Sequence, residues 1–265
     1  MLSCFCALLA RLNFDFWRSM SQSYINFQSV IPLSNLKRSK LLLSLLFVIL
    51  SYVAVSLPQE ALVKAGVNPF VLSIGQMIGF VGFALVALII LGGRKAFRDL
   101  APKPKARQIP LIFFYALLSM FLAIGLAQFV SNLQANPIID IAAASPLFMV
   151  LTALLLVFQL FFEELVAVLS FVLVYQLLAQ RGLSHKACLL LALIFSVLLA
   201  AAVHIPTYNF NVVQSLLVIG GARLGLGIAY AHSKNFWIAY LAHLLYDGVL
   251  IALALIAILG FGVSV

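Results

Sequence analysis

The stretch FQLFFEELVAVLSF, from Phe158 to Phe171, sets two adjacent carboxylates, Glu163 and Glu164, inside a strongly apolar run. A charged side chain at bilayer depth costs roughly 2.5–3.5 kcal/mol on insertion scales, so the chain must use or neutralise such a pair. The apolar run extends over residues 141–178, and at about 1.5 Å per helical residue it is longer than one straight membrane crossing. It is therefore either two spans that break near the glutamates or one long, bent helix.

The composition of the chain indicates a helical membrane protein. Of its 265 residues, 65% are hydrophobic and 9% are charged, whereas about 25% of an ordinary globular domain is charged. Several apolar stretches reach the roughly 20 residues that a transmembrane helix needs, and they are not spaced like the strands of a barrel. We expect an all-α, polytopic membrane protein whose surface contacts the lipid bilayer.

Seven or eight transmembrane helices are expected. Two turns of the second half carry the cations Arg181, Lys186 and Lys234, which favours cytoplasmic turns and seven crossings. The length of the 141–178 run favours eight, and the sequence leaves both counts open. The other apolar spans are 41–57, 70–91, 109–128, 188–203, 212–230 and 236–259.

The basic residues predict the orientation of the chain. Nine of the sixteen lysines and arginines fall in 36–40 and 93–108, which flank apolar spans. By the positive-inside rule these segments, and with them the N-terminus, are cytoplasmic, and the 58–69 and 129–140 loops lie outside. We therefore expect a multi-pass protein of the plasma membrane, and the net charge of +9 predicts no nucleic-acid partner.

Six ionisable residues lie within or at the ends of the predicted spans. Such residues usually face the protein interior and indicate a functional site. His243 and Asp247 are four residues apart, so they share one helix face, where the carboxylate can fix the tautomer of the imidazole. The set comprises Glu163, Glu164, His204, Arg223, His243 and Asp247.

The spacing of Glu163 and His204 suggests a shared depth in the membrane. Each lies about twenty residues from the turn at residues 183–184, so an antiparallel helix pair would bring them level. A carboxylate with two histidines can activate a water molecule, or it could ligate a zinc ion through Glu163, His204 and His243. Structural readings stay open, namely an interfacial histidine, polar contacts between helices and glutamates at a helix start.

Three motifs resemble those of the CAAX prenyl protease and bacteriocin-processing family, also called CPBP or Abi-type intramembrane proteases. The first is EELVAVL at 163–169, where the family has Glu-Glu-x-x-x-Arg. The second is AAAVHIPTYN, whose motif ends at His204, and the third is AYLAHLLYDG, which contains His243 and Asp247. The resemblance implies a protease core over 141–265, preceded over 1–140 by an N-terminal segment and family-variable transmembrane helices.

The chain departs from the family pattern at two positions. Val168 stands where the family has the arginine of the first motif, and Ala200 stands where it has the phenylalanine of the second. An arginine four residues after Glu164 would pair with it on the helix. Arg223 could supply that cation from another helix.

The resemblance implies an intramembrane endopeptidase that acts on a peptide or protein substrate at the membrane. Glu163 would be the general base, with Glu164 beside it, and His204 would orient the attacking water. His243 and Asp247 would stabilise the oxyanion, and metal-free and metal-dependent chemistry both stay open. The alternatives are a non-catalytic bacteriocin-immunity or scaffold protein, which Val168 favours, and a proton-coupled transporter.

Overall fold

The structure is a computed structural model that describes residues 32–56, 62, 65–134 and 146–261. Within these ranges the chain is helical and forms no strand, which confirms the predicted all-α class. The N-terminal segment 1–31 lies outside the described residues, as does half of each of the 58–69 and 129–140 loops. The long helices are α3 (Arg38–Val55), α5 (Pro69–Leu91), α7 (Ile109–Ala127), α9 (Pro146–Ala179), α10 (His185–Ala202), α12 (Gly220–Ser233) and α13 (Phe236–Phe261).

Short helices join or extend these long ones. The π-helix η4 leads directly into α12, so that Val212–Ser233 forms one candidate membrane span. The short elements are η1 (Pro32–Asn35), α6 (Arg94–Leu100), η2 (Ala106–Gln108), η3 (Pro206–Tyr208), α11 (Val212–Gln214) and η4 (Ser215–Ile219).

Helix α9 settles how the long apolar run folds. It is a single helix of 34 residues, so the run does not break near the glutamates. At 1.5 Å per residue the helix is about 51 Å long, which exceeds the roughly 30 Å of a bilayer core. In the part of the chain that the structure describes, seven helices are long and apolar enough to cross a membrane. This count agrees with the prediction from the charged turns. The 141–178 run, whose length favoured an eighth span, contributes one helix among the described residues.

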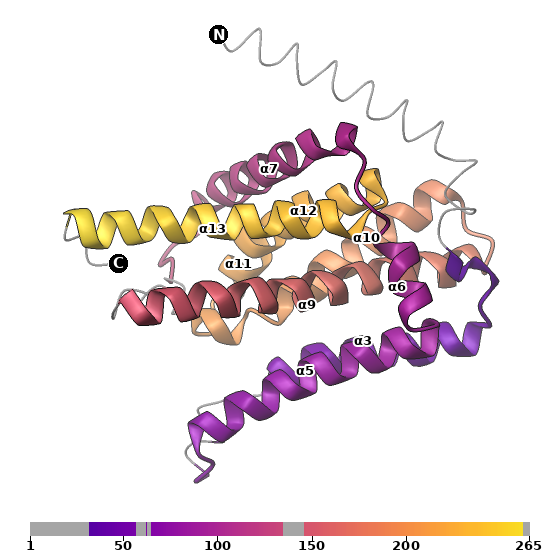
Figure 1. The fold of residues 1–265 in the computed structure, drawn as a ribbon, viewed down its shortest axis with the longest axis horizontal. Helices are drawn as coiled ribbons and strands as arrows, with labels where there is room; N and C mark the ends of the chain where they lie inside the picture. The colour runs from indigo at the N-terminus through magenta and orange to yellow at the C-terminus, as the bar shows by residue number, and fades with distance from the viewer. Residues whose placement is uncertain (1–31, 57–61, 63–64, 135–145, 262–265) are drawn as a thin grey trace, which may run out of the picture.

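Helix α9 lies in the middle of the bundle (Figure 1). The pair α3 and α5 packs against it from one side, and α10 and α13 pack against it from others. Helices α7 and α13 both contact α12, and Figure 1 shows these three as a separate layer beside α9. The burial of the candidate spans agrees with this arrangement, since 61% of the α9 window is buried and 22–50% of the others.

Glycine allows α12 to approach α7 closely. A Cβ added to Gly225 would overlap the side chain and backbone of Ser119, and one added to Gly221 would lie 2.6 Å from Leu126 Cδ1. This spacing of four residues is the small-residue contact that lets membrane helices pack tightly, where backbones meet with no bulky side chain between them. Because Gly221 and Gly225 hold one face of α12 against α7, the rotation of α12 is set so that Arg223 reaches the glutamates of α9.

Two short turns, at residues 180–184 and 234–235, place the remaining site residues. Ser184 caps α10 by accepting a hydrogen bond from the backbone N–H of Ala187. Lys234 ends α12 in the left-handed conformation, at a φ of 52°, and the Asn235 side chain then accepts from the backbone N–H of Trp237 at the start of α13. Because this turn is short, α12 and α13 are antiparallel neighbours.

Candidate active site

The two glutamates leave α9 on different faces. Adjacent residues of an α-helix project about 100° apart, so Glu163 and Glu164 cannot share one environment. The Glu163 side chain keeps 14% of its surface exposed, whereas Glu164 keeps 2%. Glu163 borders a cavity of about 270 Å³, and Glu164 borders a void of about 10 Å³, which is the space of about one water molecule.

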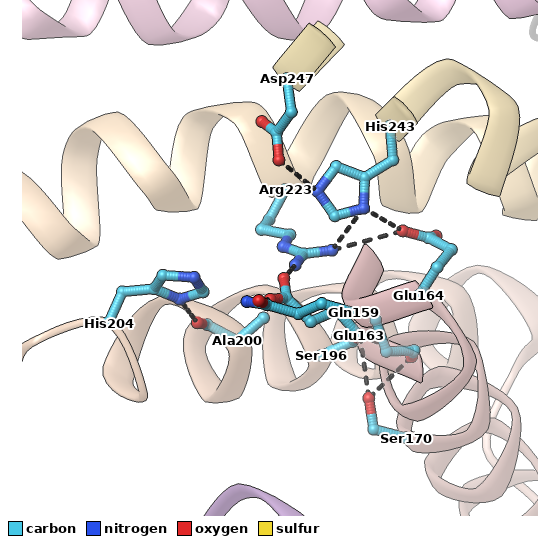
Figure 2. Close-up of polar contacts among 11 residues, drawn as sticks. Gln159, Glu163, Glu164, Ser170, Ser196, Ala200, His204, Arg223, His243 and Asp247 are labelled. Atoms are coloured by element: carbon cyan, nitrogen blue, oxygen red, sulfur yellow. Dashed lines mark hydrogen bonds and ion pairs between the residues drawn. The ribbon is translucent and has the colours of Figure 1, made fainter. Parts of the chain in front are cut away.

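Arg223 of α12 binds both glutamates. Its Nη2 donates to Glu163 Oε2 at 2.5 Å, and its Nη1 donates to Glu164 Oε2 at 3.3 Å. Figure 2 shows the guanidinium between the two carboxylates. The cation expected at Val168 is therefore supplied from another helix. Charge-assisted bonds of this kind are about twice as strong as neutral ones, and here they join α9 to α12.

His243 continues the polar network away from α9. Its Nδ1 lies 3.2 Å from Glu164 Oε2 and 3.4 Å from Arg223 Nη1. Its Nε2 lies 3.4 Å from Asp247 Oδ2, one turn along α13. Both ring nitrogens therefore face carboxylates, and the predicted pairing of His243 with Asp247 on one helix face is confirmed.

His204 lies in the turn that follows α10. Its Nδ1 donates to the backbone carbonyl of Ala200 at 2.8 Å, and a carbonyl only accepts, so Nε2 is the nitrogen that carries no proton in the neutral ring. Burial lowers the pKa of His204, and this effect outweighs the nearby Glu163 carboxylate, which acts to raise it. The imidazole is therefore neutral at pH 7 and offers Nε2 as a hydrogen-bond acceptor.

The main cavity brings Glu163 and His204 together. We use this name for the 270 Å³ space between α3, α5, α9, α12 and the turn after α10. His243 and Asp247 do not contribute to its wall among the described residues, since Arg223 separates them from it (Figure 2). The wall consists of Tyr52, Val55, Ser73, Gln76, Met77, Phe80, Gln159, Glu163, Val203, His204, Thr207 and Arg223.

The small void lies on the other face of α9. Val168 lines it together with Glu164 and Arg223, so the position of the expected arginine is next to the guanidinium that replaces it. Val168 is buried and packs in the apolar core. On this face the hydroxyls of Ser170 and Ser196 both donate to the backbone carbonyl of Ala167, at 2.8 and 2.9 Å, so α10 is hydrogen-bonded to α9.

The zinc site that Glu163, His204 and His243 could have formed is not present in the described part of the chain. Among the described residues, no group of three histidine, cysteine, aspartate or glutamate side chains is close enough together to hold a metal ion. The physical reason is Arg223, whose guanidinium occupies the position between the carboxylates where a second cation would be repelled. The nitrogens of His243 are also turned to Glu164 and Asp247.

One contact of Glu163 and one residue of its cavity wall were not predicted. Gln159 Nε2 donates to Glu163 Oε1 at 2.7 Å, and the four-residue spacing on one helix is the signal that could have indicated it. Tyr52 of α3 faces the same cavity from a helix about 110 residues earlier in the chain, and no pattern in the sequence links the two.

Comparisons with known proteins concern the segment that carries the polar network. The model of one protein family, described as Type II CAAX prenyl endopeptidase Rce1-like, matches residues 145–249, which include every residue of the predicted site. No curated protein and no solved structure matches the chain. Since the matched family is a protease family and seven described helices can span a membrane, the chain is a multi-pass integral membrane protein. The resemblance predicted from the three motifs is thereby confirmed, and residues 145–249 carry this chain's similarity to the type II CAAX prenyl endopeptidases.

Proposed function

We propose that the protein is an intramembrane endopeptidase in which Glu163 and His204 activate a water molecule. The observation that carries this proposal is that both side chains border the main cavity. A carboxylate and a neutral imidazole that border one cavity of about 270 Å³ are groups that general base catalysis can use. The substrate is a peptide or protein segment at the membrane, in keeping with the family match.

The reaction begins with the water held between the two residues. Glu163 takes one proton of the water, and His204 Nε2 accepts a hydrogen bond from the other. The water oxygen bonds to the carbonyl carbon of the peptide, and the electron pair of the C=O bond moves to the carbonyl oxygen. The electron pair on that oxygen then re-forms the C=O bond as the C–N bond breaks, and Glu163 gives its proton to the leaving amine, so the products are a carboxylic acid and an amine and the Glu163 carboxylate is regenerated.

Glu164, His243 and Asp247 act in this proposal as positioning residues. They lie behind Arg223, where Glu164 binds both Arg223 and His243, and Asp247 binds the other nitrogen of His243. This chain of contacts holds the guanidinium against Glu163 and so orients the base. It departs from the oxyanion role that the resemblance implied for His243 and Asp247, because neither borders the main cavity in the described structure.

The orientation in the membrane follows from the charged loops. With the 93–108 segment in the cytoplasm, the turn after α10, which holds His204, faces the outside of a plasma membrane. Seven crossings place the two ends of the membrane domain on opposite sides. These assignments belong to the proposal.

The test uses the full chain reconstituted in liposomes with a library of membrane-anchored peptides. We expect the wild type to cleave, and Glu163→Gln and His204→Ala each to lower cleavage by at least about 1,000-fold, because one lacks the base and the other the water acceptor. Both variants should insert and elute from size exclusion like the wild type. Full cleavage by either variant would exclude the proposed roles.

The non-catalytic alternative rested on Val168. That position lacks the arginine, yet Arg223 places a guanidinium against the same glutamates, so the charge that the departure removes is still present. A wild type that cleaves nothing in the library would favour the immunity or scaffold function. Flux of a solute driven by a pH gradient in the same liposomes would favour the transporter.

A further inference from the structure

The proposed reaction needs a hydrogen-bond donor at the scissile carbonyl oxygen, and no residue has yet been given that role. As water attacks, negative charge develops on the carbonyl oxygen, and a donor directed at that oxygen is commonly among the largest contributions to catalysis. In the main cavity, Arg223 directs Nη1 and Nη2 at the glutamates, and the Gln159 amide donates to Glu163. His204 Nδ1 donates to its own helix.

Tyr52 carries a buried hydrogen-bond donor in the cavity wall that has no partner among the described residues. Its side chain is 4% exposed, and its hydroxyl makes no hydrogen bond to any residue that the structure describes. The residue borders the main cavity together with Glu163, His204 and Arg223. Its hydroxyl lies near enough to Arg223 and Glu163 to interact with both electrostatically.

A buried hydroxyl without a partner requires an explanation, because its burial costs about 1–3 kcal/mol by protein mutational data. Four other buried side chains in the described ranges share this property, and none of the four borders the main cavity. A substrate in the main cavity can supply the hydrogen-bond partner that the Tyr52 hydroxyl lacks, which accounts for an unpaired hydroxyl at the cavity wall. The four others are Ser119, Gln176, Ser215 and Asn235.

We infer that Tyr52 is a further catalytic residue, whose O–H donates to the carbonyl oxygen of the scissile peptide as negative charge develops there. The inference rests on the proposed function. It also extends the active site beyond the segment 145–249 that matches the family, because Tyr52 belongs to α3. The α3 and α5 pair then supplies one wall and one donor of the site.

The test compares a tyrosine whose hydroxyl has no hydrogen-bond partner with one whose hydroxyl is paired. Tyr52→Phe removes the unpaired hydroxyl, so we expect kcat to fall about 100- to 1,000-fold, with KM changed less than threefold and thermal stability in detergent equal or higher. The matched control is Tyr240→Phe, whose hydroxyl donates to the Val157 carbonyl at 2.9 Å and does not border the cavity. The control should lose stability and keep kcat.

A second measurement separates a donor from a packing residue. A peptidyl phosphinate, which mimics the tetrahedral adduct, should bind Tyr52→Phe about 100-fold more weakly than the wild type, while the uncleaved peptide should bind both alike. Unchanged kcat, or a kcat loss that comes with an equal loss of stability and of peptide binding, would overturn the role of Tyr52. An inactive wild type would instead overturn the proposed function itself.

Discussion

The two faces of α9 carry the same chemical group into opposite surroundings. On one face Glu163 meets a cavity of about 270 Å³ with a neutral histidine and an unpaired tyrosine hydroxyl. On the other, Glu164 meets a void of about 10 Å³ and two cationic or ionisable partners, Arg223 and His243. Arg223 pairs with both carboxylates, but only Glu163 also borders the main cavity. In the proposed mechanism Glu163 is therefore the base, and Glu164 holds Arg223 and His243 in place.

Arg223 is the residue that connects the two faces, and its removal should have the largest effect. Arg223→Ala leaves two buried carboxylates without their cation, so we expect a loss of about 3–5 kcal/mol in the free energy of unfolding, together with the loss of cleavage. Thermal unfolding in detergent measures the first, and the peptide assay the second. Neutralising both carboxylates in the same variant, with Glu163→Gln and Glu164→Gln, should restore stability but not cleavage.

The neighbouring Val168 allows a sharper test of the same point. Val168 borders the small void with Arg223 and Glu164, so Val168→Arg in the Arg223→Ala background can use the vacated space and pair with Glu164 four residues away. The double variant should be more stable than Arg223→Ala alone. If it is equally unstable, the cation is not interchangeable between the two helices, and α12 has a structural role beyond its charge.

The second prediction compares the glutamates directly. Glu164→Gln should cost about 1–3 kcal/mol of stability, since Arg223 and His243 both lose a charged partner in a closed space. Glu163→Gln should cost less, because water in the main cavity can solvate the released Arg223 Nη2. Cleavage should show the opposite order, with a measurable rate remaining only in Glu164→Gln. A larger loss of stability in Glu163→Gln would contradict the division of labour between the faces.

Much of this architecture could be predicted from the sequence, for physical reasons that particular residues make clear. Apolar runs of spanning length have few alternatives to helices, and the charged turns at Arg181 and Lys234 indicated the seven crossings found here. The pairing of His243 with Asp247 followed from helical periodicity alone. Local rules of this kind need no knowledge of how the helices pack.

Contacts between helices could not be predicted in the same way. Whether Arg223 points at α9 depends on glycine contacts with α7, and whether Tyr52 borders the cavity depends on how α3 docks. For a related reason the sequence could not decide whether Glu163, His204 and His243 converge, because level depth does not determine which helix face a residue occupies. Glu163 and His243 lie on opposite sides of one guanidinium.

The smallest effects should still separate the faces, because one local polar contact can be removed from each. Gln159→Leu deletes the bond to Glu163 Oε1 on the cavity side, so we expect kcat to fall about tenfold with little change in stability. Ser196→Ala deletes the bond to the Ala167 carbonyl and the bond accepted from Ser170 on the closed side, which should cost about 1–2 kcal/mol of stability and leave kcat unchanged. Equal effects of the two substitutions on kcat would mean that strain passes through α9 from one face to the other. The open face would then depend on the closed one for its packing as well as for its charge.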